Sequence, residues 1–217
     1  LRAMGIDLML GYGITECSPI VSVNASLNGR RAADETVGWT FPSVEVKIDQ
    51  PDYTGSGEVL VRGDNVMMGY YNDPYSTADV FTDGWFRTGD LGHLNKDGSL
   101  TITGRKKNLI ILSNGENVSP EEIEYQLARI PEIKEVVVYT EGNLIVAEIF
   151  PEENEMTDAD LKAVLQERIN DYNAHQPSHK RVNKVKIRKN EFEKTTTHKI
   201  KRYKVLEKSK KEQEKES

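Results

Sequence analysis

Apolar residues in the first half of the chain follow the pattern of short strands separated by turns. Three apolar stretches lie at residues 44–48, 57–62 and 99–103. Turn signals lie between them, among them Asp83-Gly84 and Asp97-Gly98, and Asp-Gly is typical of hairpin turns. After a strand-turn segment and polar loop in residues 1–35, the pattern predicts a small β-rich unit over about residues 37–104, with a hairpin turning at Asp97-Gly98.

After Arg105 the apolar positions take helical spacing. Ser119 stands at an N-cap position before a proline and two glutamates, a combination that favours the start of a helix. The apolar face of this helix would consist of Ile123, Leu127 and Ile130. A second helix is predicted after the Thr-Asp-Ala-Asp segment at residues 157–160. Its apolar face would consist of Leu161, Val164, Leu165 and Ile169.

Strand patterns alternate with these helices. Residues 134–140 and 144–150 are predicted as two strands that turn at Gly142-Asn143, and residues 182–188 as a further strand. Because the helices are apolar on one face only, they need a sheet to cover. The second half therefore reads as a compact α+β domain.

Composition limits the classes of protein that fit. The chain has 217 residues, of which 37% are hydrophobic and 29% charged, as expected for one large or two modest soluble domains. Its apolar runs are far shorter than the roughly 18 residues that a membrane span needs. Cys17 is the only cysteine, which excludes an internal disulfide and favours a reducing compartment. No secretory segment opens the chain, so we expect a cytoplasmic location.

Charge is distributed unevenly along the chain. The net charge is −6, yet residues 179–217 hold 15 Lys and Arg against 6 Asp and Glu. A basic end of this kind could meet nucleic acid, an anionic lipid surface or a phosphorylated small molecule. Residues 207–217 are almost entirely polar, and we expect them to form a charged, frayed tail.

Two short stretches near the start of the chain carry groups that suit a nucleotide. In the first, Tyr12-Gly-Ile-Thr-Glu16, Tyr12 offers a flat face for a base, and Gly13 allows close backbone approach. Thr15 can bind a phosphate oxygen, and Glu16 can hold Mg²⁺. In the second, Thr88-Gly-Asp90, Asp90 follows a glycine in an expected turn and can accept two hydrogen bonds from a ribose diol.

Two further stretches supply cations. Arg105, in Gly104-Arg-Lys-Lys107, can donate a fork of hydrogen bonds to ribose or phosphate. Lys199, at the end of Lys194-Thr-Thr-Thr-His-Lys199, is a point charge on a flexible stem that suits developing negative charge. Taken singly, each of these residues has an ordinary structural explanation. Together they suit a nucleotide.

The order and spacing of these motifs resemble the adenylate-forming superfamily of acyl-CoA synthetases, adenylation domains and luciferases. The resemblance is carried by YGITE, GWFRTGDLG, GRKKNLIILSNGENVSPEEIE and KTTTHKIKR, and it extends from about residue 4 to residue 206. The segments GYGITECSPIVSVN and GRKKNLII are most similar to the long-chain fatty acid–CoA ligases.

The resemblance implies an α+β architecture in which this chain is the C-terminal portion of a longer enzyme, an expectation that its first residue, Leu1, also favours. Residues 1–104 would end the large AMP-binding domain, 105–107 would form a hinge, and 108–206 would form a small mobile domain. The intact enzyme would use ATP, Mg²⁺ and coenzyme A to convert a carboxylic acid, with fatty acids expected, into a thioester and AMP. The chain alone would lack adenylation activity because the glycine-rich phosphate loop lies upstream.

The resemblance also implies roles for single residues. Tyr12 would stack on adenine, Thr15 would touch phosphate, and Glu16 would position Mg²⁺. Asp90 would bind the ribose hydroxyls with help from Arg105. Lys199 would bridge the reacting carboxylate and the α-phosphate, and Lys107 would be the pivot of the hinge.

Two positions depart from the family pattern. His198 stands where glycine is usual before the late lysine, which restricts the loop backbone or adds a titrating group there. Ile111 stands where some relatives carry a second lysine for the thioester step, although long-chain relatives are often apolar at this position.

Two other functions remain open from the sequence. The acyl group could pass to the phosphopantetheine of a carrier protein instead of coenzyme A. Alternatively, the chain could be a non-catalytic module whose basic end binds nucleic acid or an anionic membrane. Aromatic residues are the usual stacking platforms for single strands, and the basic end has only Phe192 and Tyr203 among them, which speaks against nucleic acid. Peripheral contact with a membrane is compatible with each of these proposed functions.

Overall fold

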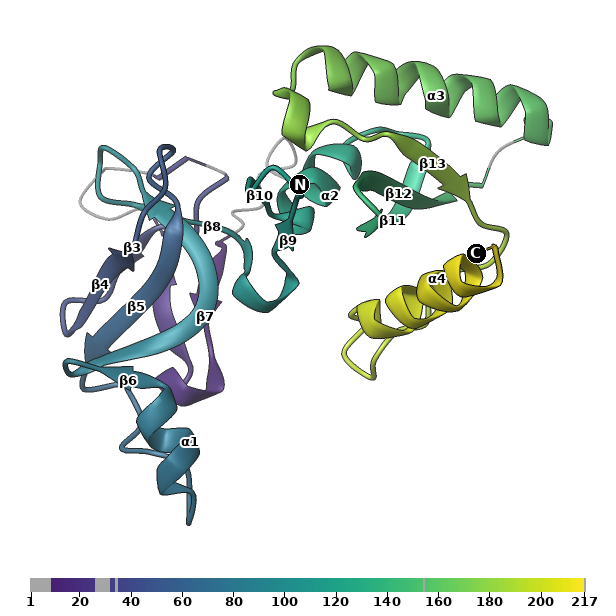
Figure 1. Cartoon of the computed structure of the whole chain (residues 1–217). Helices are drawn as coiled ribbons and strands as arrows, with labels where there is room; N and C mark the ends of the chain where they lie inside the picture. The colour runs from purple at the N-terminus through teal and green to yellow at the C-terminus, as the bar shows by residue number, and fades with distance from the viewer. Residues whose placement is uncertain (1–8, 26–31, 34, 154, 217) are drawn as a thin grey trace. The chain divides into compact units, whose positions relative to one another are not determined.

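The chain folds into two compact units, Leu1–Lys107 and Asn108–Ser217, each with its own strands and core (Figure 1). The computed structural model describes residues 9–25, 32–33, 35–153 and 155–216. Among the described residues, no helix combines the length and apolar character needed to cross a membrane.

The first unit consists of two antiparallel sheets and short helices. A five-stranded sheet has the order β4-β5-β7-β6, with β8 also paired to β7. Its strands are β4 (Val44–Asp49), β5 (Gly57–Gly63), β6 (Phe81–Thr82), β7 (Trp85–Leu94) and β8 (Leu100–Arg105). The three-stranded sheet contains β1 (Gly11–Gly13), β2 (Ile20–Val23) and β3 (Trp39–Thr40). The helices are the 3-10 turn η2 (Thr15–Cys17) and α1 (Pro74–Asp79).

Local turn chemistry explains the strand connections in this unit. Asp83 and Gly84 have φ angles of 50° and 78° and form the two-residue turn that joins β6 to β7. The predicted hairpin at Asp97-Gly98 is confirmed, with Gly98 at φ 82° in the loop between β7 and β8. Buried side chains from both sheets and from η2 then form one apolar cluster: Cys17, Val21, Val44, Val59, Val61, Phe86 and Leu100.

The second unit is built around a three-stranded sheet of order β11-β12-β13. β11 (Ile133–Glu141) pairs antiparallel with β12 (Leu144–Pro151), which pairs parallel with β13 (Lys184–Ile187). The helices are α2 (Pro120–Leu127), α3 (Asp158–Ala174) and α4 (Arg202–Glu216). Short elements complete it: η3 (Lys106–Asn108, which starts in the first unit), β9 (Ile110–Ile111), β10 (Asn117–Val118) and η4 (Ser178–Lys180).

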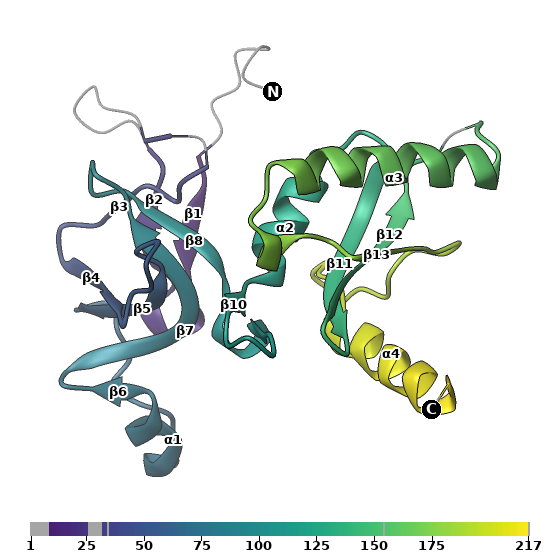
Figure 2. The same ribbon diagram turned by 45° about the horizontal axis from the view of Figure 1, so that its top comes forward.

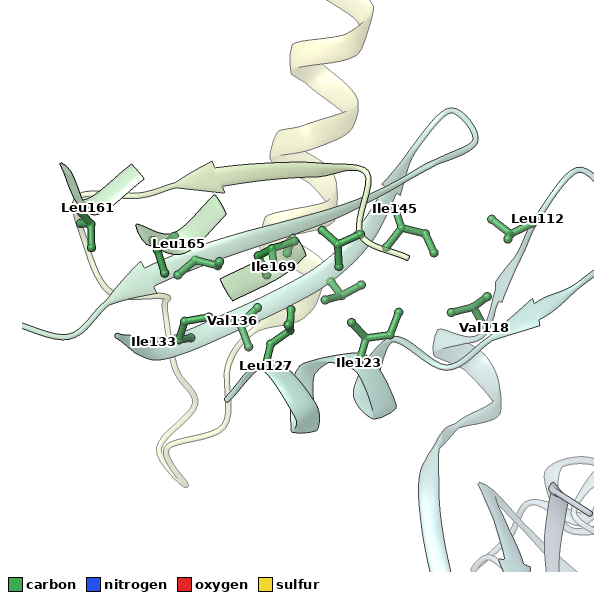
Figure 3. Close-up of a cluster of buried hydrophobic side chains, with 14 residues drawn as sticks. Leu112, Val118, Ile123, Leu127, Ile133, Val136, Ile145, Leu161, Leu165 and Ile169 are labelled. Carbon is green, nitrogen blue, oxygen red and sulfur yellow. The ribbon is translucent and has the colours of Figure 1, made fainter. Parts of the chain in front are cut away.

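Both predicted helices begin where their caps stand. Ser119 is the N-cap of α2, and Thr157 is the N-cap of α3, where its hydroxyl accepts from the Asp160 N–H at 3.2 Å. Figure 3 shows Ile123 and Leu127 of α2 in one cluster with the buried face of α3. That face consists of Leu161, Leu165 and Ile169.

Alternation along the strands gives the sheet a second apolar face. Val136 and Val138 belong to the cluster of α2 and α3, whereas Val137 and Tyr139 belong to a smaller cluster that includes Val205 of α4. Figures 1 and 2 both show α3 and α4 on opposite sides of this sheet. The sheet is therefore covered on both faces.

The expectation of a frayed tail over residues 207–217 is wrong for the described residues. α4 continues to Glu216, and Ser209 in its middle is only 4% exposed. The Ser209 hydroxyl lies 3.2 Å from Glu141 Oε1, and Lys186 Nζ of β13 lies 3.2 Å from Glu212 Oε2. A polar helix is thus held by polar contacts with the sheet, which composition alone does not reveal.

A candidate nucleotide site

The sequence suggested that Asp90 lies in a turn. In the structure it lies within strand β7. The strand carries a bulge at this point, because Gly89 takes a left-handed φ of 68° and the register with β5 shifts here. The Thr88 hydroxyl donates to the Val59 carbonyl at 2.7 Å and accepts from the Asp90 N–H at 3.0 Å. The bulge therefore sets the direction of the Asp90 side chain.

The Asp90 carboxylate is buried and meets two donors. Tyr12 Oη donates to Oδ2 at 2.6 Å, and Arg105 Nε lies 2.6 Å from Oδ1. Arg105 is the last residue of β8 and the direct cross-strand partner of Asp90. The structure thus brings together three residues that the sequence singled out separately. A carboxylate oxygen carries two lone pairs and only accepts hydrogen bonds, which suits hydroxyl donors.

The Tyr12 phenol is held in its protonated, donating form. Burial, reinforced by the negative charge of Asp90, raises the pKa of Tyr12 far above its ordinary range. The ring also packs against the apolar cluster of the first unit. The hydrogen bond to Asp90 joins positions 78 residues apart, and nothing in the sequence pointed to it.

Gly13 serves the fold of its own loop. A Cβ atom at this position would lie 1.8 Å from the Pro19 carbonyl oxygen, so any side chain would collide with backbone. The close approach at Gly13 is therefore to the chain itself, which differs from the close approach to a ligand that the motif suggested.

Thr15 and Glu16 lie in the 3-10 turn η2, one residue after the end of β1. Thr15 is exposed, and Glu16 Oε1 accepts from the Tyr70 hydroxyl at 3.0 Å. Within the described residues, no group of three His, Cys, Asp or Glu side chains could hold a metal ion. A single carboxylate still fits Mg²⁺ that arrives with nucleotide phosphates, because this ion keeps several waters and takes one or two protein carboxylates.

Lys199 lies in an exposed turn of the second unit. The Thr195 N–H donates to the Lys199 carbonyl at 2.8 Å, and the Lys199 N–H donates to the Thr195 hydroxyl at 3.2 Å. His198 takes a left-handed φ of 59°, a conformation in which glycine is easiest and histidine is tolerated. The family's usual glycine at this position thus has a plain backbone reason.

The turn that carries Lys199 is anchored on both sides. Lys194 and Ile200 pair as an isolated bridge at its base. Arg202 then donates to the Val138 carbonyl at 2.8 Å and pairs with Glu124 of α2. The Glu124 side chain is 16% exposed, and burial raises its pKa despite the nearby Arg202. No feature of the sequence pointed to this anchor, although Glu124 lies within the motif GRKKNLIILSNGENVSPEEIE.

Lys107 is the last residue of the first unit and lies in the short turn η3. The boundary between the two units follows it directly. Ile111 lies in β9 and is 74% exposed, so its side chain is not part of an apolar core.

Comparison with protein families gives two matches that together cover most of the chain. Residues 1–71 match the family described as AMP-binding enzyme. Residues 107–215, half of the chain, match the family described as AMP-binding enzyme C-terminal domain.

Two curated relatives show the extent of the similarity. An indoleacetate–CoA ligase of Aromatoleum aromaticum is 41% identical over 165 residues, which cover 71% of this chain and 32% of the relative. A long-chain-fatty-acid–CoA ligase of Mycobacterium bovis is 42% identical over 137 residues, covering 63% of this chain and 22% of the relative. The chain therefore spans about a third or less of the length of these relatives.

A solved structure of ATP-bound MatB from Rhodopseudomonas palustris is similar in fold. The superposition has a TM-score of 0.77 and 26% sequence identity, and it covers 94% of this chain and 41% of the MatB chain.

Proposed function

Because this chain belongs to the family of AMP-binding enzymes, we propose that it forms the C-terminal part of an ATP-dependent acyl-CoA ligase. The observation that carries this proposal is the buried Asp90 carboxylate, held between Tyr12 and Arg105 in the first unit. A buried acceptor with a cation at its side suits the two hydroxyls of a ribose and the phosphate beyond them.

The proposed reaction has two steps. A substrate carboxylate oxygen attacks the α-phosphorus of ATP, the bond to the bridging oxygen of pyrophosphate breaks, and acyl-adenylate and pyrophosphate form. The thiol of coenzyme A then attacks the acyl carbon, loses its proton, and displaces AMP. Mg²⁺ bound with the nucleotide would neutralise phosphate charge in the first step.

The residues of this chain have separate tasks in that scheme. Asp90 accepts from the ribose hydroxyls, Arg105 donates beside it, and Thr15 donates to a phosphate oxygen. Glu16 would be the carboxylate that holds Mg²⁺. In the first step Lys199 offsets the repulsion between the carboxylate and the phosphate, both anionic.

The task of Lys199 ends with the first step, since the thiol needs access to the acyl carbon in the second. A turn at Lys107 would exchange the surface that faces the nucleotide. The unit boundary directly after Lys107 supports this assignment of the hinge.

Relatives favour coenzyme A as the acceptor and an aliphatic or aromatic acid as the substrate. The names of the two curated relatives specify indoleacetate and a long-chain fatty acid, each joined to coenzyme A. We propose a fatty acid, because the motif GYGITECSPIVSVN resembles the long-chain branch. A cytoplasmic location suits an enzyme of this kind.

Asp90→Ala in the full-length enzyme tests the proposal. We expect the dissociation constant for AMP to rise by about tenfold or more, because a ribose loses a charged acceptor. Isothermal titration measures this. Asp97→Ala, in the loop of the same β7–β8 hairpin, is the matched control and should bind AMP like the parent. Unchanged AMP affinity in Asp90→Ala would remove Asp90 from the site.

A further inference from the structure

Glu58 is a buried carboxylate that the proposed reaction does not use. It is the second residue of β5 and is only 6% exposed. A buried charge is costly unless it is paired, and Glu58 is paired twice, with Lys106 Nζ at 2.8 Å and with the Arg87 guanidinium. Arg87 Nη2 also lies 3.9 Å from Asp49 Oδ2, so the four charges balance.

One contact of Glu58 reaches the bulge that orients Asp90. Glu58 Oε1 accepts from the Gly89 N–H at 3.3 Å, directly before Asp90 in the chain. The next residue of β5, Val59, accepts from the Thr88 hydroxyl at 2.7 Å. Strand β5 therefore holds the bulge at two successive residues, one through a carboxylate and one through the backbone.

A second contact of Glu58 reaches the end of the first unit. Lys106 follows Arg105 directly, and its ammonium group is the one that pairs with Glu58. Asp90 and Arg105 are cross-strand partners, so Glu58 touches the chain neighbours of both. An ion pair with only a structural role would not need to contact both Gly89 and Lys106.

We propose that Glu58 is a positioning residue of the nucleotide site. It keeps the Asp90 carboxylate in place through Gly89, and through Lys106 it fixes the end of the first unit, so that rotation begins at Lys107. This inference rests on the proposed function and extends it to a residue that touches neither nucleotide nor substrate.

Two variants of the full-length enzyme separate the two tasks. Glu58→Gln keeps the shape but removes the charge that holds Lys106 and Arg87. We expect AMP to bind about fivefold more weakly, because the neutral amide oxygen accepts from the Gly89 N–H more weakly than the carboxylate does. We also expect a changed ratio between adenylate formation and thioester formation from supplied acyl-adenylate. Lys106→Met should change that ratio by about fivefold, with AMP affinity within about twofold of the parent, because the Gly89 contact remains.

The matched control is Glu45→Gln, which removes the same charge from a pair with Arg62 in the same sheet. Both members of that pair are exposed, so neither AMP affinity nor the ratio should change. The inference is overturned if Glu58→Gln behaves like Glu45→Gln, or if both half-reactions only fall with the folded fraction. If Asp90→Ala also leaves AMP affinity unchanged, the proposed function itself has failed, and not only the role of Glu58.

Discussion

At Asp90, side chains from three separate stretches of the first unit meet around one buried carboxylate. Tyr12 comes from β1, Arg105 ends β8, and Asp90 lies on the bulge of β7. Sequence motifs identified all three residues, because each is a side-chain type that suits a nucleotide. Their contacts could not be predicted, since pairing across 78 residues depends on the register of strands and on the bulge at Gly89.

Buried phenols make the stability of the fold sensitive to alkali. Burial raises the pKa of Tyr12, and burial together with Glu122 raises the pKa of Tyr172 to about 12. The fold keeps these groups protonated while the unfolded chain loses their protons near pH 10. The contribution of these phenols to the free energy of unfolding should therefore be fully present below about pH 10. The free energy of unfolding should fall as the pH rises further.

Urea denaturation of Tyr12→Phe at pH 9 and pH 11 measures how much this residue contributes to the fall in the free energy of unfolding. We expect a shallower fall than in the parent, by up to about 1.4 kcal/mol per pH unit for one tyrosine. Tyr53→Phe is the control, because Tyr53 is 84% exposed. Equal slopes in Tyr12→Phe and the parent would mean that Tyr12 titrates normally.

Among the elements, those set by local chemistry were predictable and those set by distant contacts were not. Asp83-Gly84 and the cap Thr157 act within a few residues, so the sequence predicted the turn signal and the helix start. The short strands β9 and β10 escaped prediction because each has only two residues. The continuation of helix α4 over residues 207–216 escaped it because charged residues dominate this segment, and its partners Glu141 and Lys186 lie on other elements.

The packing of α4 gives a prediction at the same scale. Ser209→Ala should lower the free energy of unfolding by about 1 kcal/mol, since Glu141 loses a donor under the helix. Lys211→Ala, on the exposed side of α4, should change it by less than about 0.5 kcal/mol. Urea denaturation compares the two variants. Equal small effects would mean that this segment is a frayed tail and does not pack on the sheet.

For the molecule as a whole, the division into two units carries its own expectation. Both apolar clusters of the second unit draw only on residues from Ile110 onward. A protein of residues 108–217 should therefore unfold in one cooperative transition. Leu165→Ala, in the middle of that core, should cost about 2–5 kcal/mol. Circular dichroism during heating measures both, and a gradual loss of signal in the unmodified fragment would contradict an independent unit.

In the proposed reaction Lys199 of the second unit acts in the first step only, so its loss should affect the two half-reactions differently. We measure both half-reactions in full-length Lys199→Ala, with Lys201→Ala as the control for loss of a neighbouring charge. The account predicts that adenylate formation falls by about a hundredfold or more, while thioester formation from supplied acyl-adenylate stays close to the parent. Equal losses in the two half-reactions, or equal effects of the two variants, would contradict it.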